Sequence, residues 1–281
     1  MKLEFTKMQG CGNDYVYVNG FTQKIPANRK KELIPLLSDR HFGIGSDGVI
    51  FINPSETADF EMEMYNADGS RAEMCGNGIR CVAKYVYDHK MTDKDEITIA
   101  SFDKVKPIRI TAENGVAKYI RVDMGIPELD PEKIPVISEQ ERVINEPIEA
   151  GGREYAMTCV SMGNPHAVIF EDPDEVGLET AGPLIENHRV FPNRVNVEFV
   201  KILDRKNVRM RVWERGTGET LACGTGCCAT AVACILNGYT DRSITVHVLG
   251  GDIEVEWDEA DGRIYMTGPA ETVFDGIIDI G

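Results

Sequence analysis

The sequence predicts an α+β protein made of two homologous halves, and two observations support this. The first is a junction that occurs twice: an alternating strand ends, a cysteine follows, and a helical pattern begins. The matching segments are Phe60–Tyr65 with Cys75-Gly-Asn-Gly78 and Val208–Trp213 with Cys223-Gly-Thr-Gly226. The second is that Leu3–Asn13 corresponds to Glu154–Asn164. A single duplication explains both, whereas a solenoid would need more and shorter repeats.

The first half alternates short strands with two helices. Alternation of apolar and polar residues predicts strands, and apolar residues at helical spacing predict helices. Strands are expected at Leu3–Met8, Tyr15–Val18, Val49–Ile52, Phe60–Tyr65, Ile97–Ser101, Lys106–Thr111 and Val116–Asp123. Helices are expected at Ala27–Leu37, after Pro26, and at Gly78–Asp88, with turns at Gly10–Asn13 and Asn66–Gly69.

The second half repeats this order after an irregular acidic stretch that contains Pro127, Pro131 and Pro135. Clustered prolines favour a domain crossing, so we place the halves at residues 1–120 and 121–267. Further strands are expected within Glu154–Asn164 and at His166–Ile169, Arg194–Val200, Val208–Trp213, Ser243–Leu249, Asp252–Trp257, Arg263–Thr267 and Thr272–Ile280. The expected helices are Leu178–Asn187 and the run that follows Cys223 and stops at Asn237-Gly238.

Composition excludes several classes of partner. The formal net charge is -16, which argues against nucleic acid because nucleic-acid binding needs a positive footprint. The same charge argues against an anionic membrane surface, and no apolar run approaches the length of a membrane span. The segment Met1–Met8 has an early acidic residue and no apolar core, so we expect no signal peptide and a cytoplasmic location.

The chain has eight cysteines but no C-x-x-C pair, and its histidines are few and scattered. This spacing argues against a structural metal site, and a cytoplasmic chain argues against a disulfide framework. Cys11 is expected in a loop that could lie near a site. The cysteines that we expect to be buried packing residues are Cys81, Cys159, Cys227, Cys228 and Cys234.

Cys75 and Cys223 differ because each precedes Gly-x-Gly at the start of a helix. Unpaired backbone N–H groups and the helix dipole should lower the pKa of such a thiol and hold a carboxylate. If the halves pack about a pseudo-twofold axis, the two thiols face each other across one cleft. One thiolate can then remove a proton next to the carboxylate while the opposite thiol donates one, which inverts a stereocentre without a cofactor.

The chain resembles the diaminopimelate epimerase family over its full length. The resemblance is carried by Gly12-Asn-Asp14, Tyr65-Asn-Ala-Asp-Gly-Ser70, Met74-Cys-Gly-Asn-Gly-Ile-Arg80, Ser161-Met-Gly-Asn-Pro-His166, Arg194-Val-Asn-Val197, Trp213-Glu-Arg-Gly216 and Ala222-Cys-Gly-Thr-Gly226. It implies two pseudo-twofold-related domains, each a curled mixed β-sheet or barrel around a central helix, with the active site in the cleft between them. It also implies that residues 268–281 complete the first domain.

The resemblance implies conversion of LL-2,6-diaminopimelate to the meso form, in lysine and peptidoglycan-precursor biosynthesis, with no cofactor and no metal. Cys75 then corresponds to the proton donor and Cys223 to the acceptor, with His166 and Glu214 auxiliary to catalysis. The residues that correspond to substrate-binding groups are Asn13, Asn66, Gly76, Asn77, Asn164, Asn196, Glu214, Arg215, Gly224 and Thr225. The resemblance is also compatible with a homodimer.

Structural explanations stay open for several of these polar residues. Asn13, Asn66 and Asn164 are also typical turn residues, and Glu214 with Arg215 could form a surface ion pair. A buried histidine with satisfied hydrogen bonds is the ordinary explanation for His166.

One position departs from the family pattern, and two other functions compete. Many relatives carry Gln where this chain has Gly48, so a contact to substrate is missing or replaced. A proline or hydroxyproline epimerase of the same architecture is the nearest alternative, although a small cyclic substrate would not need a distal clamp at Asn196 and Arg215. A non-catalytic redox- or metal-binding cysteine protein is the alternative from a different class.

Overall fold

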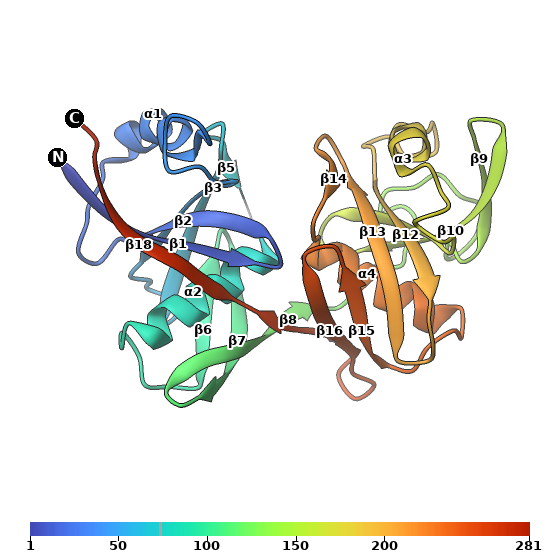
Figure 1. The fold of residues 1–281 in the computed structure, drawn as a ribbon. Coiled ribbons are helices and arrows are strands. Elements are labelled where there is room, and N and C mark those ends of the chain that lie inside the picture. Colours follow the sequence, from blue (N-terminus) through green and yellow to red (C-terminus); the bar gives the residue numbers. More distant parts are fainter. Residues whose placement is uncertain (73–74) are drawn as a thin grey trace. The chain divides into compact units, whose positions relative to one another are not determined.

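The computed structural model describes residues 1–72 and 75–281, so Met74 of the Met74–Arg80 motif lies outside the described residues. The chain forms two compact units, one of residues 1–122 with 268–281 and the other of residues 123–267 (Figure 1). No helix in the described ranges is both long and apolar enough to cross a membrane.

The first unit is a mixed sheet with two helices. Its strands are β1 (Lys2–Gly10), β2 (Asn13–Asn19), β3 (Gly48–Asn53), β4 (Phe60–Asn66), β5 (Arg71–Ala72), β6 (Glu96–Ser101), β7 (Lys104–Glu113), β8 (Val116–Gly125) and β18 (Glu271–Asp279). Its helices are α1 (Ala27–Ser38) and α2 (Gly76–Asp88). Pairing runs β18–β1–β2–β3–β4–β6–β7–β8, with β5 as a short hairpin return on β4.

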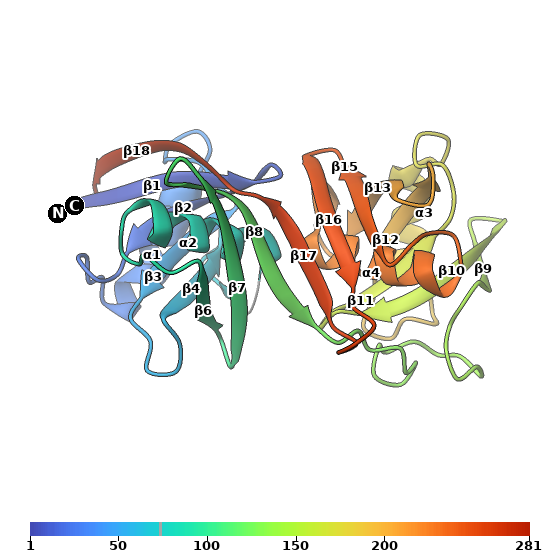
Figure 2. The same cartoon turned by 90° about the horizontal axis from the view of Figure 1, so that it is seen from below.

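The parallel pairs explain where the helices lie in the sequence. β2 pairs in parallel with β3 and β4 with β6, and α1 and α2 lie in the chain within these two crossovers. Parallel strands need such a crossover because a tight turn cannot join them. α2 contacts β1, β2, β6, β7 and β18, and Figures 1 and 2 show it enclosed by the curl of this sheet.

The second unit repeats the arrangement. Its strands are β9 (Glu146–Ala150), β10 (Arg153–Ser161), β11 (Pro165–Ile169), β12 (Asn196–Ile202), β13 (Asn207–Glu214), β14 (Gly218–Thr220), β15 (Ser243–Val248), β16 (Gly251–Trp257) and β17 (Ile264–Pro269). Its helices are α3 (Leu178–Glu186) and α4 (Gly224–Leu236). Pairing runs β9–β10–β11–β12–β13–β15–β16–β17, with β14 on β13.

The two sheets have the same order and the same parallel positions, since β11–β12 and β13–β15 are the parallel pairs of the second unit. α4 contacts β10, β11, β12, β13, β15 and β16, as α2 contacts its own sheet. The predicted duplicated α+β fold is therefore confirmed. Within each unit the pairings of the described strands do not close on themselves, so each sheet curls around its helix without forming a barrel.

Three short strands were not predicted: β5, β9 and β14. β5 and β14 are hairpin returns too short to show an alternation. β9 follows the proline-rich stretch and contains Pro147, which weakens a strand pattern. α2 also begins at Gly76, two residues before the predicted start at Gly78, because Cys75 rather than Asn77 is its N-cap.

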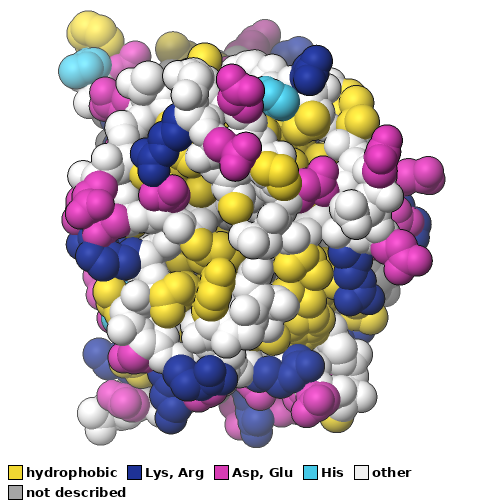
Figure 3. Space-filling model, turned by 90° about the vertical axis from the view of Figure 1, so that its right-hand side faces the viewer, with side chains coloured by type: hydrophobic (Ala, Val, Ile, Leu, Met, Phe, Trp, Pro, Cys, Tyr) yellow, Lys and Arg dark blue, Asp and Glu magenta, His cyan; other side chains and the backbone are white. Residues whose placement is uncertain are grey.

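Charged side chains of both signs are mixed on the face of the protein that Figure 3 shows. Figure 3, which views the protein from the side of α3 and β9, shows acidic and basic groups interspersed, with apolar groups between them. Asp172, for example, accepts hydrogen bonds from both Lys201 and Arg209. Exposed pairs of this kind contribute at most about 1 kcal/mol each to stability.

The cysteines expected in the core are buried there. Cys81, Cys159, Cys227, Cys228 and Cys234 are all 1% exposed or less. The described residues include all eight cysteines, and none of them forms a disulfide. Burial favours the neutral thiol, because a thiolate loses its hydration in an apolar core.

We expect the free energy of unfolding to fall as the pH rises above about 8.5, the usual pKa of an unfolded thiol. Burial raises the pKa of Cys81 to about 11 and of Cys234 to about 12, and it also raises the pKa of Cys159. Between the unfolded and folded pKa values only the unfolded chain has lost these protons. Each thiol then lowers the free energy of unfolding by about 1.4 kcal/mol per pH unit.

Urea denaturation at a series of pH values between about 8 and 10 measures this slope. The Cys234→Ala variant removes one of the ionising thiols, so its slope should be smaller than that of the wild type. A free energy of unfolding that stays constant over this range would contradict the prediction.

Candidate active site

Cys75 and Cys223, the two cysteines that are followed by Gly-x-Gly, occupy equivalent positions in their units. Cys75 is the N-cap of α2, with φ −135° and ψ 116°, and Cys223 is the N-cap of α4, with φ −119° and ψ 109°. Both backbones are extended, so each side chain stands beside the N–H groups of the first helical turn. The backbone N–H of Gly78 donates to Cys75 Sγ at 3.3 Å. The predicted placement of a cysteine at each helix start is thus observed.

The second glycine of each motif makes room for the sulfur. A Cβ atom on Gly78 would lie 3.6 Å from Cys75 Sγ and 2.8 Å from Ile50 Cδ1. A Cβ atom on Gly226 would lie 3.3 Å from Cys223 Sγ and 2.8 Å from Glu198 Oε1. Any side chain at either position would therefore displace the thiol or its neighbour.

Cys75 lies in a hydrogen-bonded chain with Asn13 and Asp47. Asn13 Nδ2 donates to Asp47 Oδ2 at 2.7 Å, so the amide is oriented by an acceptor that cannot donate. Its oxygen Oδ1 then accepts from the Cys75 thiol at 3.1 Å. Asp47 is itself fixed by Arg40, at 2.9 Å, and by the Asp14 N–H, at 3.1 Å. The geometry presents Cys75 as a protonated thiol.

The second unit has a different chain of polar groups at the equivalent place. His166 Nδ1 lies 2.7 Å from Glu198 Oε1, and His166 Nε2 lies 3.2 Å from Asn164 Oδ1. His166 and Glu198 are both 0% exposed. His166 is therefore a buried histidine with a partner on each ring nitrogen, and through Asn164 it reaches a predicted substrate-binding residue.

The environment of Cys223 corrects the expectation that a helix start lowers its pKa. Cys223 is 7% exposed, and burial raises the pKa of its thiol well above the usual range. The negative charges of Glu214 and Glu198 raise this pKa further, and hydrogen bonds from Thr225 and the Gly226 backbone only partly oppose them. Loss of hydration therefore outweighs the effect of the helix N-terminus on the pKa of Cys223.

The remaining predicted residues of the first unit divide into two groups. Gly76 and Asn77 form the buried first turn of α2, directly after Cys75. Asn66, by contrast, is the exposed last residue of β4, where its Nδ2 donates to Ser70 Oγ at 3.0 Å and its backbone N–H donates to Ser70 O at 2.9 Å across the following turn. Asn13 lies beside Cys75, whereas Asn66 is held by its own turn.

In the second unit, Gly224 and Thr225 form the first turn of α4, and Thr225 Oγ1 lies 3.5 Å from Cys223 Sγ. Buried Asn196 accepts from the Arg215 backbone N–H at 2.9 Å, which fixes the start of the β13–β14 turn. The Arg215 side chain is exposed, and its Nη1 donates to Asn193 O at 2.9 Å. Glu214 Oε1 accepts from Thr220 Oγ1 at 2.5 Å.

Gly48 has no room for a larger side chain such as the Gln that the family resemblance implies at this position. It pairs with Asn66 across β3 and β4, and a Cβ atom there would lie 2.0 Å from Tyr65 O and 2.9 Å from Tyr15 Cε1. A side chain at this position would require the β3–β4 register or the Tyr65 backbone to shift.

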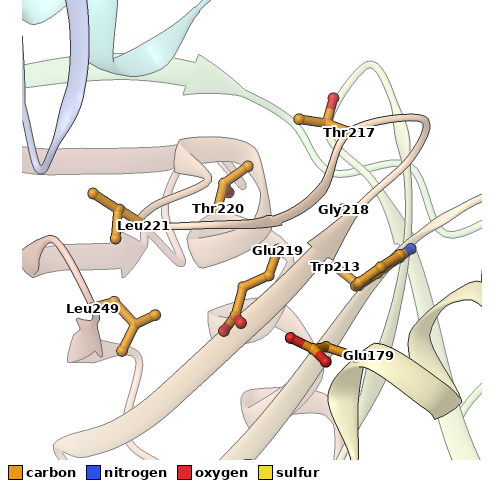
Figure 4. Close-up of a pocket in the computed structure, with 8 residues that line it drawn as sticks. All are labelled: Glu179, Trp213, Thr217, Gly218, Glu219, Thr220, Leu221 and Leu249. Atoms are coloured by element: carbon orange, nitrogen blue, oxygen red, sulfur yellow. The ribbon is translucent and has the colours of Figure 1, made fainter.

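A hollow of about 690 Å³ lies beside the β13–β14 hairpin but contains none of the predicted site residues. In Figure 4, Leu221 and Leu249 lie on one side of it and Trp213 and Glu179 on the other, with Glu219 between them. Glu219 forms a two-pronged ion pair with Arg211, at 2.6 and 3.0 Å, so its charge is already balanced. Within residues 1–72 and 75–281, no group of three or more His, Cys, Asp or Glu is arranged to hold a metal ion.

Asp47 and Glu198 were not predicted as site residues. Asp47 stood in a glycine-rich loop with no pattern of its own. Glu198 had a detectable signal, because Val197-Glu-Phe-Val200 places an acid within an apolar strand that is buried from Asn196 to Val200. A charged residue in such a position is almost never fully buried unless it has a partner.

Comparison with known proteins identifies relatives of the whole chain. The profile of the family described as "Diaminopimelate epimerase" matches residues 5–129 and 158–273. A protein named diaminopimelate epimerase from Methanococcus maripaludis (strain S2 / LL) is 57% identical over 279 residues, covering 99% of this chain and 100% of the relative. One of the same name from Agathobacter rectalis is 57% identical over 287 residues, with the same coverage.

Solved structures with low sequence identity share the fold. A phenazine biosynthesis protein of the PhzF family from Bacillus anthracis superposes with a TM-score of 0.72 at 15% identity, over 100% of both chains. A hydroxyproline epimerase from Agrobacterium vitis superposes with a TM-score of 0.69 at 16% identity, covering 99% of this chain and 91% of that one. At such identities the likeness concerns architecture alone.

Proposed function

This chain belongs to the diaminopimelate epimerase family, and we propose that it interconverts LL- and meso-2,6-diaminopimelate by proton transfer at one α-carbon. The observation that carries the proposal is the equivalent placement of Cys75 and Cys223, each at the N-terminus of a buried helix in one of two similar units. The reaction removes a proton from one face of a carbon and adds a proton to the opposite face. It therefore needs one acid–base group on each face, and two thiols can fill these two roles.

The two thiols have different surroundings that suit different roles. Cys75 donates to Asn13 Oδ1 and is held as a thiol, which fits a proton donor in the LL-to-meso direction. Cys223 must become a thiolate to act as the acceptor, although its burial and the charges of Glu214 and Glu198 oppose this. The α-ammonium group of the substrate carries a positive charge, so its arrival would offset these carboxylates and favour the thiolate.

The reacting carboxylate would be held by the first turns of both helices. The backbone N–H groups of Gly76 and Asn77 on α2, and of Gly224 and Thr225 on α4, lie at helix N-termini, which attract anions. Charge that develops on this carboxylate when the α-proton leaves would be stabilised by the same groups. The proposal requires the two units to place these turns around one substrate.

The other end of the substrate needs its own amino-acid recognition. Arg215 offers an exposed guanidinium whose position is set by Asn193 and, through the backbone, by Asn196. A guanidinium matches a carboxylate in a two-pronged arrangement. Asn66, Asn164 and Glu214 supply further polar groups for the ammonium and carboxylate of diaminopimelate.

Incubation of LL-diaminopimelate with purified protein in deuterium oxide tests the function. We expect meso product with deuterium at one α-carbon, without added pyridoxal phosphate or metal. L-Proline and trans-4-hydroxy-L-proline serve as control substrates and should remain unlabelled. Labelling of either control together with no change in diaminopimelate would replace this proposal with an imino-acid epimerase.

We also propose that the protein works in the cytoplasm as a homodimer. Eight cysteines without a disulfide among the described residues suit a reducing compartment. Strand β18 exposes Val273, Phe274 and Ile277, and such apolar groups on an outer strand favour association. Light scattering on the purified protein should give twice the mass of the chain, and a monomer would refute the dimer.

A further inference from the structure

The two thiols face different residues at one equivalent position. Ile50 pairs with Met64 and Glu198 pairs with Val212, and these pairs coincide when the repeated strands are superimposed. Ile50 Cδ1 and Glu198 Oε1 each come within 2.8 Å of the point that a Cβ on the motif glycine would occupy. The half that contains Cys75 therefore has an apolar methyl group where the half that contains Cys223 has a carboxylate.

Glu198 is in a costly position for a carboxylate. It is 0% exposed, and His166 Nδ1, 2.7 Å from Oε1, is the partner of one oxygen. Its second oxygen, Oε2, has no hydrogen-bond partner in the part of the chain that the structure describes. A buried acid with one oxygen unsatisfied destabilises a fold compared with an apolar residue such as Ile50. This suggests a role other than packing.

The hydrogen bonds assign the protons of His166. Asn164 Oδ1 is a carbonyl oxygen that can only accept, so His166 Nε2 must donate to it. One further proton lies between His166 Nδ1 and Glu198 Oε1, whichever of the two atoms holds it. With Glu198 on Nδ1 and the Asn164 oxygen on Nε2, the His166 ring thus has a fixed Nε2–H donor.

This arrangement gives Asn13 and Asn164 opposite hydrogen-bonding roles. Asn13 donates its Nδ2 to Asp47 and offers its oxygen to Cys75. Asn164 has its oxygen occupied by His166, and none of the described residues accepts a hydrogen bond from its Nδ2. Asn13 therefore offers an acceptor, whereas Asn164 offers an N–H donor, although the two residues match in the sequence repeat.

We propose that Glu198 is a positioning residue, which holds the His166 ring as an Nε2–H donor and thereby leaves the Asn164 amide as a donor to an anionic group of the substrate. This inference rests on the proposed function for the identity of the substrate. The proton on Nε2 is the essential element. If Nε2 lost that proton, Asn164 would turn to donate to it and would present its oxygen to the substrate carboxylate.

A double-mutant cycle in kcat/KM tests the coupling. Glu198→Gln keeps the shape of the side chain but can both donate and accept, so the His166 tautomer is no longer fixed. We expect a loss of about 10- to 100-fold in kcat/KM, the effect of one hydrogen bond to a charged group. Asn164→Ala should lose at least as much, and the double variant should be no worse than Asn164→Ala alone.

Glu63→Gln is the matched control. Glu63 is a nearly buried carboxylate on β4 of the other unit, where it pairs with Lys30 and accepts from Asn53 Nδ2 at 2.7 Å. Its replacement removes the same charge from a buried strand and should leave kcat/KM within about twofold of the wild type. The proposal would be overturned if the kcat/KM losses of Glu198→Gln and Asn164→Ala multiplied in the double variant. It would also be overturned if Glu198→Gln kept the kcat/KM of the wild type.

A measurement on the wild type does not depend on the folding of any variant or on turnover. In protein labelled with ¹⁵N at histidine, His166 should show a protonated Nε2, and a His166→Gln variant identifies its signal. A bare Nε2 in the wild type would overturn the role of Glu198 even if the enzyme epimerises diaminopimelate. If Nε2 is protonated but the protein leaves diaminopimelate unlabelled, the proposed function is wrong and the role of Glu198 in holding the His166 ring is not.

Discussion

Cys75→Ala and Cys223→Ala should each abolish epimerisation of diaminopimelate. Removal of a general acid or base typically lowers a rate by about 10²–10⁴-fold, and this reaction needs both groups in each turnover. The α-proton is very weakly acidic, so its removal requires a reactive base close to a carbon whose carboxylate is already stabilised. Initial rates from the LL and the meso substrate measure the effect in both directions.

Serine variants separate the two roles of each thiol. A serine hydroxyl is barely ionised near neutral pH and is a poor base, but it can still donate a proton. Cys75→Ser and Cys223→Ser should therefore retain little activity, and each should be worse in the direction in which that residue is the base. The rate should also show a bell-shaped dependence on pH, with apparent pKa values that belong to the coupled pair.

Cys234→Ala is a suitable control for these variants, because Cys234 lies near the end of α4 and is fully buried. Its replacement should affect stability more than turnover. Near wild-type epimerisation by either Cys75→Ala or Cys223→Ala would show that the Cys-Gly-x-Gly repeat is only structural.

Much of the fold could be predicted because the duplication provided a second copy of each signal. The alternation in Phe60–Tyr65 and in Val208–Trp213 marked strands that the structure places at the same point of each sheet. The pairing of strands was less accessible. β4 pairs in parallel with β6 across α2, a contact between residues far apart in the sequence that local periodicity does not encode.

The N-cap positions of Cys75 and Cys223 could be predicted from the sequence, whereas their electrostatic surroundings could not. Cys75 and Cys223 were found because the N-cap position is a local property of the sequence. The raised pKa of Cys223 depends on burial and on Glu214 and Glu198, which come from other strands. The opposite polarity of Asn13 and Asn164 likewise depends on distant partners, Asp47 in one case and His166 with Glu198 in the other.

Mild oxidation should inactivate the enzyme completely, and a reductant should restore it. If Cys75 and Cys223 face each other across one substrate carbon, their thiols can approach within disulfide distance when the substrate is absent. Formation of the S–S bond transfers two electrons and two protons from the two thiols to an added disulfide such as oxidised glutathione, whose S–S bond breaks to give two molecules of reduced glutathione. Neither sulfur can then exchange a proton. Activity should therefore fall in proportion to the fraction of molecules that contain the disulfide, and dithiothreitol should restore it.

Peptide mapping by mass spectrometry should find Cys75 linked to Cys223 in the inactive sample, and saturating diaminopimelate should slow the loss. Cys11→Ala is the matched control, because Cys11 is another buried thiol of the first unit, with its Sγ 3.6 Å from Arg80 Nη2. This variant should be inactivated and restored like the wild type. Full activity in a sample whose Cys75 and Cys223 are shown to be linked would rule out the two-thiol mechanism, because a disulfide has no proton to give and no thiolate to receive one.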